Sequence, residues 1–210
     1  MLSEKQFRER AKSELRQIGS RVRTLATDRD LYRKLEREVV QPNPQLCEAR
    51  SDFLEMVRAA YTDAMTARVL HLLEGEDESA SLPRLLAQLA EHAAILEDKI
   101  TESEFANDRG ALERAARNLK HAAAPRFARH ERTLPALAAA HRELDATLDL
   151  MIETVKTYYW IVSGSYIDLE VRFSDDPLSI FQSPWVLPGA GEVIKGSRLR
   201  RDLPDGAISL

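Results

Sequence analysis

The sequence contains one cysteine, Cys47, among 210 residues. A lone cysteine excludes an internal disulfide and a zinc site built from several cysteines, and it favours a reducing compartment. No apolar run approaches the roughly 20 residues that a membrane-spanning helix needs. Residues 1–6 contain no apolar stretch typical of a signal peptide. We therefore expect a cytoplasmic protein that does not insert into a membrane.

Glycine and proline are also scarce, and they gather near the C-terminal end. Residues 1–163 contain three of the 8 glycines and five of the 9 prolines. Because both residue types interrupt helices, this distribution predicts a long helical body and an irregular tail. The hydrophobic content of 44% and the mixed charge signs favour a folded domain over disorder. We predict an all-α fold: an elongated bundle of about five to six helices over residues 1–170, with residues 171–210 as an irregular tail that packs back on it.

Apolar residues before Pro125 recur three and four positions apart, which is the helical period. We expect Asp28 or Asp30 to begin a second helix, Pro42 to end it, and Pro125 to end another. The expected helices cover residues 3–25, 28–41, 46–73, 82–100 (capped by Ser81) and 111–124. The expected apolar face of the third helix comprises Phe53, Val57, Ala60, Tyr61, Ala64 and Leu72.

The longest pattern follows Thr133 and predicts a final helix that ends near Gly164. Two sets of residues with seven-residue spacing are offset from each other by four positions, as in an a/d heptad seam. Such a seam forms either the core of the chain's own bundle or the interface of a dimer, and both interpretations stay open. We interpret His141, on the seam, as a core or interface histidine with satisfied polar atoms. The two sets are Leu137, Leu144, Met151 and Tyr158, and His141, Leu148, Val155 and Val162.

Several familiar active sites are absent from the sequence. There is no Walker-type phosphate loop and no His-Glu-x-x-His zinc motif. A di-iron bundle needs a glutamate three residues before a histidine, and none of the 5 histidines has one at that spacing. We therefore expect neither a metal nor a cofactor.

The clearest chemical signal is a cationic stretch from Arg114 to Arg132. It holds six cations and one acid, Glu131, and so carries a charge of +5 within a chain of net charge −4. This concentration suits a polyanion, because neutralised phosphates supply most of the affinity for nucleic acid. A merely solvated helix face is the alternative. The cations are Arg114, Arg117, Lys120, Arg126, Arg129 and Arg132, and His121 and His130 lie among them.

Within this stretch, Arg126 and His130 have the chemistry for RNA cleavage. An arginine holds a phosphate with its planar guanidinium at any ordinary pH, and a histidine moves protons near neutral pH. Together they would hold the scissile phosphate and move the 2′-hydroxyl or leaving-group proton without a metal. A surface or helix-capping role for His130 is the alternative.

Five short stretches, in order along the chain, resemble the HEPN superfamily (higher eukaryotes and prokaryotes nucleotide-binding) in its abortive-infection AbiU-like branch. They are Asp28-Arg29-Asp30-Leu31-Tyr32 with Asn43-Pro44 after it, Tyr61-Thr62-Asp63-Ala64, Ser81-Leu82-Pro83-Arg84-Leu85-Leu86, Arg126 to Arg132, and Phe181-Gln182-Ser183-Pro184-Trp185. The resemblance implies an all-α bundle that is usually dimeric. Many members are metal-independent ribonucleases of toxin or phage-defence systems, whereas others have lost catalysis.

The motif of this family is an arginine followed a few residues later by a histidine, and two protomers bring their motifs together. Here three residues separate Arg126 from His130, fewer than is usual in the family. Two functions stay open. A homodimer could cleave RNA with Arg126 and His130 as catalytic residues, or an inactive homodimer could bind RNA, a nucleotide or a protein partner such as an antitoxin. The expected substrate-binding residues are Arg117, Lys120, Arg129 and Arg132.

Overall fold

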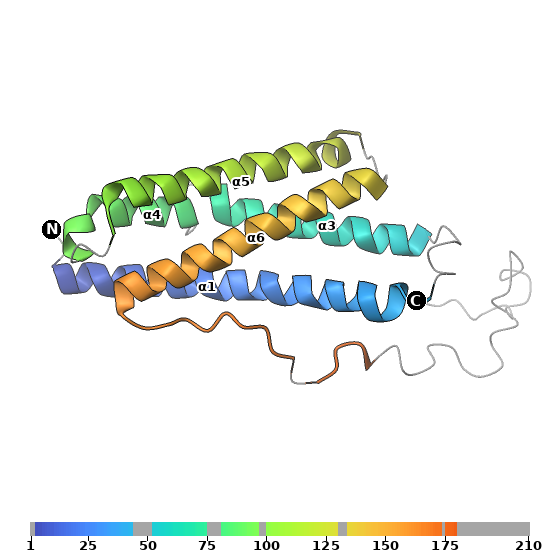
Figure 1. The fold of residues 1–210 in the computed structure, drawn as a ribbon, viewed down its shortest axis with the longest axis horizontal. Coiled ribbons are helices and arrows are strands. Elements are labelled where there is room, and N and C mark those ends of the chain that lie inside the picture. Colours follow the sequence, from blue (N-terminus) through green and yellow to red (C-terminus); the bar gives the residue numbers. More distant parts are fainter. Residues whose placement is uncertain are drawn as a thin grey trace, which may run out of the picture. The chain divides into compact units, whose positions relative to one another are not determined.

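The computed structural model of the protein describes residues 3–43, 52–74, 81–96, 100–129, 134–173 and 175–179. Over these ranges the structure has five α-helices and no strand, so the predicted all-α fold is confirmed (Figure 1). None of these helices combines the length and the apolar content that crossing a membrane requires. The α-helices are α1 (Glu4–Leu35), α3 (Asp52–Glu74), α4 (Leu82–Glu91), α5 (Glu102–Arg129) and α6 (Leu134–Ser163), with a short π-helix, η1 (Glu36–Val40), and a 3-10 helix, η2 (Ala93–Leu96).

The chain divides into two units, Met1–Arg172 and Phe173–Leu210. All of the α-helices belong to the first unit, in which α6 packs against α5, α1 and α3, and α5 also packs against α4 and α3. Figure 1 shows α6 running between α5 and α1. Most of the second unit lies outside the described residues, so the expected packing of the tail stays a prediction.

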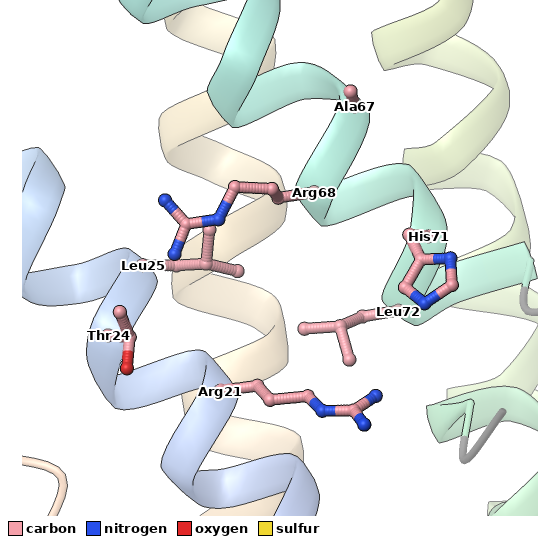
Figure 2. Close-up of a pocket in the computed structure, with 7 residues that line it drawn as sticks. All are labelled: Arg21, Thr24, Leu25, Ala67, Arg68, His71 and Leu72. Atoms are coloured by element: carbon pink, nitrogen blue, oxygen red, sulfur yellow. The ribbon is translucent and has the colours of Figure 1, made fainter.

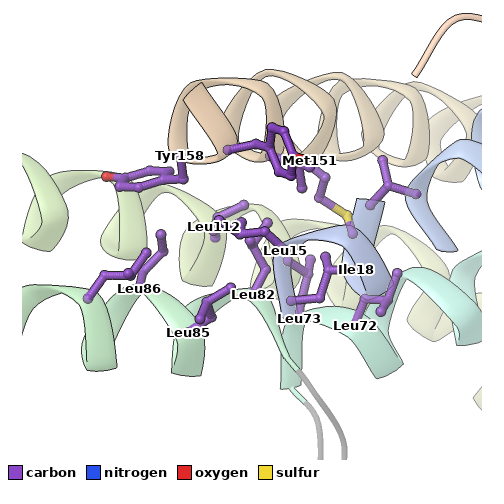
Figure 3. Close-up of a cluster of buried hydrophobic side chains, with 14 of the residues drawn as sticks. Leu15, Ile18, Leu72, Leu73, Leu82, Leu85, Leu86, Leu112, Met151 and Tyr158 are labelled. Carbon is purple, nitrogen blue, oxygen red and sulfur yellow. The ribbon is translucent and has the colours of Figure 1, made fainter. Parts of the chain in front are cut away.

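The heptad seam of α6 lies in the core of this bundle. Leu144, Leu148, Met151, Val155 and Tyr158 are at most 1% exposed, as expected if the seam is a bundle core. The Tyr158 hydroxyl donates a hydrogen bond to the Asp108 carboxylate of α5 at 2.8 Å, so the one polar group among them is satisfied. Figure 3 shows the side chains that surround the seam, among them Leu15 and Ile18 of α1, Leu72 and Leu73 of α3, Leu82, Leu85 and Leu86 of α4, and Leu112 of α5.

The first helix is longer than the sequence predicted. The expected break at Asp28 or Asp30 is wrong, because α1 continues to Leu35 and η1 extends the helical path to Val40. No glycine or proline interrupts residues 20–41. Instead of capping a new helix, the two carboxylates form ion pairs, Asp28 with Arg68 and Asp30 with Arg29.

The apolar face predicted for α3 is wrong at three of its six residues. Phe53 is 66% exposed, and Ala60 and Ala64 also face solvent. Small and apolar residues surround most of this helix, so periodicity alone does not select one face and tertiary packing decides. The side that packs inward carries Leu54, Ala59, Thr62, Met65, Thr66, Val69, Leu72 and Leu73.

Pro125 does not end a helix, contrary to the prediction. α5 runs through Pro125 to Arg129 as one α-helix. A proline in a helix interior removes one backbone hydrogen bond and crowds the carbonyl four residues earlier, at a cost of about 3 kcal/mol. Leu119 and Ala123, in the turns just before Pro125, are at most 1% exposed. Burial of these turns against the core outweighs the local cost of the proline.

The end of α6 leads into an extended segment that packs on α1. Gly164 has a φ of 65°, a left-handed conformation that glycine adopts without strain, and α6 ends just before it. Ile167 and Leu169 then pack against the core. A Cβ at Gly19 of α1 would lie 2.7 Å from Ile167 Cδ1. The absence of a side chain at Gly19 therefore allows this close approach.

We expect Pro125→Ala to raise the free energy of unfolding by about 1–3 kcal/mol, because alanine restores the missing N–H and is the best helix former. Urea denaturation followed by circular dichroism measures the change. Asn118→Ala, at an exposed position of the same helix, is the control and should add less than about 0.7 kcal/mol. A Pro125→Ala variant no more stable than the wild type would contradict this account of α5.

Candidate functional site

The C-terminal half of α5 carries cations on its solvent side. Arg114, Arg117 and His121 are exposed and lie three to four residues apart, which places them on one side of the helix. Lys120 is also exposed, and its Nζ lies 2.7 Å from the Glu74 carboxylate at the end of α3. Within the described part of the chain, no carboxylate pairs with Arg114 or Arg117. We name Arg114, Arg117, Lys120 and His121 the α5 cationic face; it includes Arg117 and Lys120 of the predicted substrate-binding set.

The helix dipole does not explain this charge. Acidic residues near a helix N-terminus and basic residues near its C-terminus are stabilising, but the effect falls off within one turn. Glu102 and Glu104 in the first turn of α5 follow this rule. Arg114 and Arg117 lie roughly three turns or more before Arg129, where the helix ends. Their positive charge therefore adds little to the stability of α5 through the dipole.

The predicted catalytic pair falls at the junction of α5 and α6. The backbone of Arg126 and Arg129 lies in the last turn of α5, whereas the side chains of both residues lie outside the described part of the chain. His130 and Arg132 belong to residues 130–133, which the structure does not describe. The roles of these four residues therefore stay predictions. The structure does change their context, because the backbone of Arg126 lies in the last turn of a helix instead of following one.

A second polar cluster joins α1, η1, α3 and α6, and it was not predicted from the sequence. Tyr32 of α1 and Tyr61 of α3 stack with their ring centroids 3.9 Å apart. His141 of α6 lies edge-on to both rings, at 5.3 Å from Tyr32 and 5.7 Å from Tyr61. Its Nε2 lies 2.6 Å from Thr62 Oγ1, so the interpretation of His141 as a satisfied core histidine is confirmed. We name Tyr32, Glu36, Arg58, Tyr61, Thr62 and His141 the Tyr–His cluster.

Glu36, the first residue of η1, accepts hydrogen bonds from two other residues of this cluster. Arg58 of α3 donates to both Glu36 oxygens at 2.8 Å, and the Tyr32 hydroxyl donates to Oε1 at 2.9 Å. Burial by itself raises the pKa of the Glu36 carboxyl, but the hydrogen bonds from Arg58 and Tyr32 outweigh it and hold this pKa below its ordinary value of 4.5. Burial, and then the Glu36 charge, raise the pKa of Tyr32, whose hydroxyl stays a donor at neutral pH.

The Tyr–His cluster contains residue types found in active sites, but Glu36, Arg58 and Thr62 already engage each other or their neighbours. Both Glu36 oxygens accept hydrogen bonds within the protein, and Thr62 is fully buried and donates to the Arg58 carbonyl at 2.7 Å. A general base or nucleophile must reach its substrate. We therefore interpret the cluster as a clamp between α1, α3 and α6. Over the described ranges, no three His, Cys, Asp or Glu side chains gather as metal ligands either.

Two of the stretches that carry the HEPN resemblance meet in this cluster. Tyr32 ends the first stretch and Tyr61 begins the second, and their rings stack. Nothing in the spacing of either stretch indicates this contact, because it depends on how α1 and α3 pack. Within the cluster, helical periodicity signalled only Tyr61, on the expected apolar face of residues 46–73, and His141, on the heptad seam.

Comparison of the chain with protein-family models, with curated proteins and with solved structures finds no match. The HEPN resemblance therefore depends on the five stretches alone. The function has to be argued from the charges and contacts described above.

We expect Glu36→Gln to lower the free energy of unfolding at pH 7 by about 1 kcal/mol. This value is near the lower end of the range for hydrogen bonds to charged groups, because the site is partly solvated. The pKa of Glu36 is lower in the folded chain than its ordinary value of 4.5, so its stabilisation is complete above pH 4.5. It is lost as the pH falls through the folded-state pKa. Thermal melts at several pH values should show the difference between wild type and variant shrinking as the pH is lowered below 4.5.

The control for this experiment is Glu38→Gln, which removes an exposed carboxylate from the same π-helix. Its effect should be below about 0.5 kcal/mol at pH 7. A Glu36→Gln difference that stays constant with pH would show that the carboxylate charge of Glu36 does not stabilise the fold.

Proposed function

We propose that this protein is a HEPN-like, RNA-binding protein whose contact surface is the α5 cationic face, and that it cleaves RNA without a metal near the α5–α6 junction. The observation that carries the proposal is the exposure of Arg114 and Arg117, for which the described part of the chain provides no carboxylate partner. Unpaired cations attract phosphates, and phosphate neutralisation supplies most of the affinity for nucleic acid. In a chain of net charge −4, this face places two exposed arginines without a described carboxylate partner on one side of α5.

The geometry of the face suits an extended phosphate backbone. A helix rises 1.5 Å per residue, so the positions from Arg114 to His121 span about 10 Å along α5. Each arginine offers a planar pair of donors that can hold a phosphate through two hydrogen bonds. The same helix leads on to Arg126 and Arg129 in its last turn, so the basic sequence continues toward the junction.

Cleavage would take place beyond the end of this face. Arg126 would hold the scissile phosphate, while His130 would take the proton of the 2′-hydroxyl and supply one to the leaving oxygen. Arg129 and Arg132 would hold the flanking phosphates. α6 begins at Leu134, and the positive end of its dipole favours negative charge there. By the HEPN resemblance, two protomers of a homodimer would share the site.

The second candidate function is binding without cleavage, to RNA, a nucleotide or a protein partner such as an antitoxin. The continuation of α5 through Pro125 favours it, because it leaves Arg126 and Arg129 at the carboxyl end of a helix. The negative end of the helix dipole stabilises these arginines but opposes a bound phosphate. The α5 cationic face is the same in both functions, so separate measurements of binding and cleavage distinguish them.

We expect single-stranded RNA to bind in a salt-dependent manner and the Arg114→Gln/Arg117→Gln double variant to bind more weakly, as measured by fluorescence anisotropy. Each lost phosphate contact should reduce the slope of log K against log salt by about 0.7. The control is Arg10→Gln/Arg23→Gln, which removes two exposed arginines from α1 and changes the net charge equally. An equal loss of affinity in both double variants would assign binding to the net charge instead of the α5 cationic face.

Cleavage is measured on several RNAs in the presence of EDTA. We expect the wild type to cut at least one of them, and His130→Ala and Arg126→Ala to be slower, the histidine variant by about 10²–10⁴-fold because it lacks the acid–base group. His71→Ala, an exposed histidine of α3, is the control. If the wild type binds RNA but is as inert as His130→Ala, the non-catalytic function holds.

A further inference from the structure

A groove between α1 and α3 has the features of a second binding site. Its volume is about 370 Å³, and the described residues that line it come from these two helices. Small organic ligands ordinarily occupy pockets of about 300–1,000 Å³. No residue of the α5 cationic face lines the groove, so an inference about its ligand does not depend on RNA binding.

The floor of the groove is apolar. Leu25 of α1 and Leu72 of α3 form it and are 1% and 2% exposed. Figure 2 shows both side chains in the space between the two helices. Ala67 lines the groove with a side chain of one carbon and faces solvent, which leaves room above the floor. The two leucines are already almost wholly buried, so an apolar body gains mainly by covering the exposed surface of the whole lining, most of which is apolar.

Three basic side chains surround this floor. Arg68 of α3 forms an ion pair with Asp28 of α1, which fixes its guanidinium and neutralises part of its charge. Arg21 extends from α1 toward α3 (Figure 2), and no carboxylate among the described residues pairs with it. His71 adds a polar ring from the last turn of α3. The groove thus combines an uncompensated guanidinium with an apolar floor.

We propose that this groove binds a small amphiphilic anion: an aromatic or aliphatic body that carries a carboxylate or a phosphate ester. The body covers Leu25 and Leu72, and the anionic group accepts paired hydrogen bonds from Arg21 and a further one from His71. A neutral apolar molecule would leave Arg21 without a partner, and an inorganic anion would leave the apolar surface of the lining in contact with water. Both parts of the ligand are needed to match the site.

The extent of the groove favours a small molecule over a docked helix. The lining residues fall within 21–25 of α1 and 67–72 of α3, which is less than about two turns of either helix. A helix bound in a groove is held by anchors at i, i+3, i+4 and i+7, which need a longer apolar channel.

Two fluorescent probes test the chemistry. 8-Anilinonaphthalene-1-sulfonate carries an anion on an aromatic body, and N-phenyl-1-naphthylamine has the same body without the anion. We expect the full chain to bind the sulfonate about tenfold more tightly than the neutral probe. Arg21→Gln should remove that difference and leave the affinity for the neutral probe unchanged. Arg23→Gln, at an exposed arginine of α1 outside the groove, should leave both affinities unchanged.

A pair of tryptophan variants tests the location. Ala67→Trp fills the groove and should abolish binding of both probes, whereas Ala60→Trp, at an exposed alanine earlier on α3, should have no effect. Thermal melts check that both variants fold. Equal affinity for the two probes, an unchanged preference in Arg21→Gln, or equal losses in the two tryptophan variants would each overturn the proposal.

Displacement of the sulfonate probe identifies the anionic group. Decanoate presents a carboxylate on an aliphatic chain, and phenyl phosphate presents a phosphate ester on a ring. Displacement by either compound supports the site and names its preferred anion. Displacement by neither, or equally good displacement by inorganic phosphate, would overturn it, because the apolar floor would then contribute nothing.

Discussion

Burial of one side of α6 along its length is the constraint on which the bundle depends. Leu144, Leu148, Met151 and Val155 are at most 1% exposed, and full burial of a side chain of this kind contributes roughly 1.5–3 kcal/mol. α5, α1 and α3 all pack against this helix. The seam therefore sets the positions of the helices that carry the α5 cationic face, the Tyr–His cluster and the α1–α3 groove.

Polar contacts then fix how the helices lie around the seam. Arg29 and Arg33 of α1 pair with Asp149 and Asp145 of α6 at 2.5 and 2.8 Å. Arg29 is only 8% exposed, and a buried guanidinium without its partner would be strongly destabilising. A shift of α1 along α6 would break both pairs at once. The Tyr–His cluster adds a third helix to this arrangement, because His141 contacts Thr62 and Tyr61 of α3.

The helical fold and the seam could be predicted because both follow from local periodicity. Leu144, Leu148 and Met151 repeat at a spacing that only a helix buried on one side satisfies. On α3 the same reasoning failed, because Ala60 and Ala64 suit solvent and core equally and packing decides between them. It failed at Pro125 for a related reason, since burial of the neighbouring turns outweighs a purely local cost. Periodicity predicts which residues form a helix, but it does not predict which residues of different helices contact each other.

For the same reason, a cationic stretch of the sequence does not by itself define a cationic binding site. The basic character of α5 is visible in the sequence, but the availability of each cation depends on acids from other helices. Lys120 and Arg68 are matched by Glu74 and Asp28, which the sequence places far away. Arg117 has no such match within the described part of the chain.

Arg21 shows the same limit on α1, where residues 5–23 hold seven cations and two acids. It becomes a candidate ligand contact only because the fold places an apolar floor beside it and no described acid against it. A charge can attract a ligand only where the fold has not already compensated it. Ion pairing across helices, more than the charge of any segment, therefore decides where this acidic chain can hold an anion.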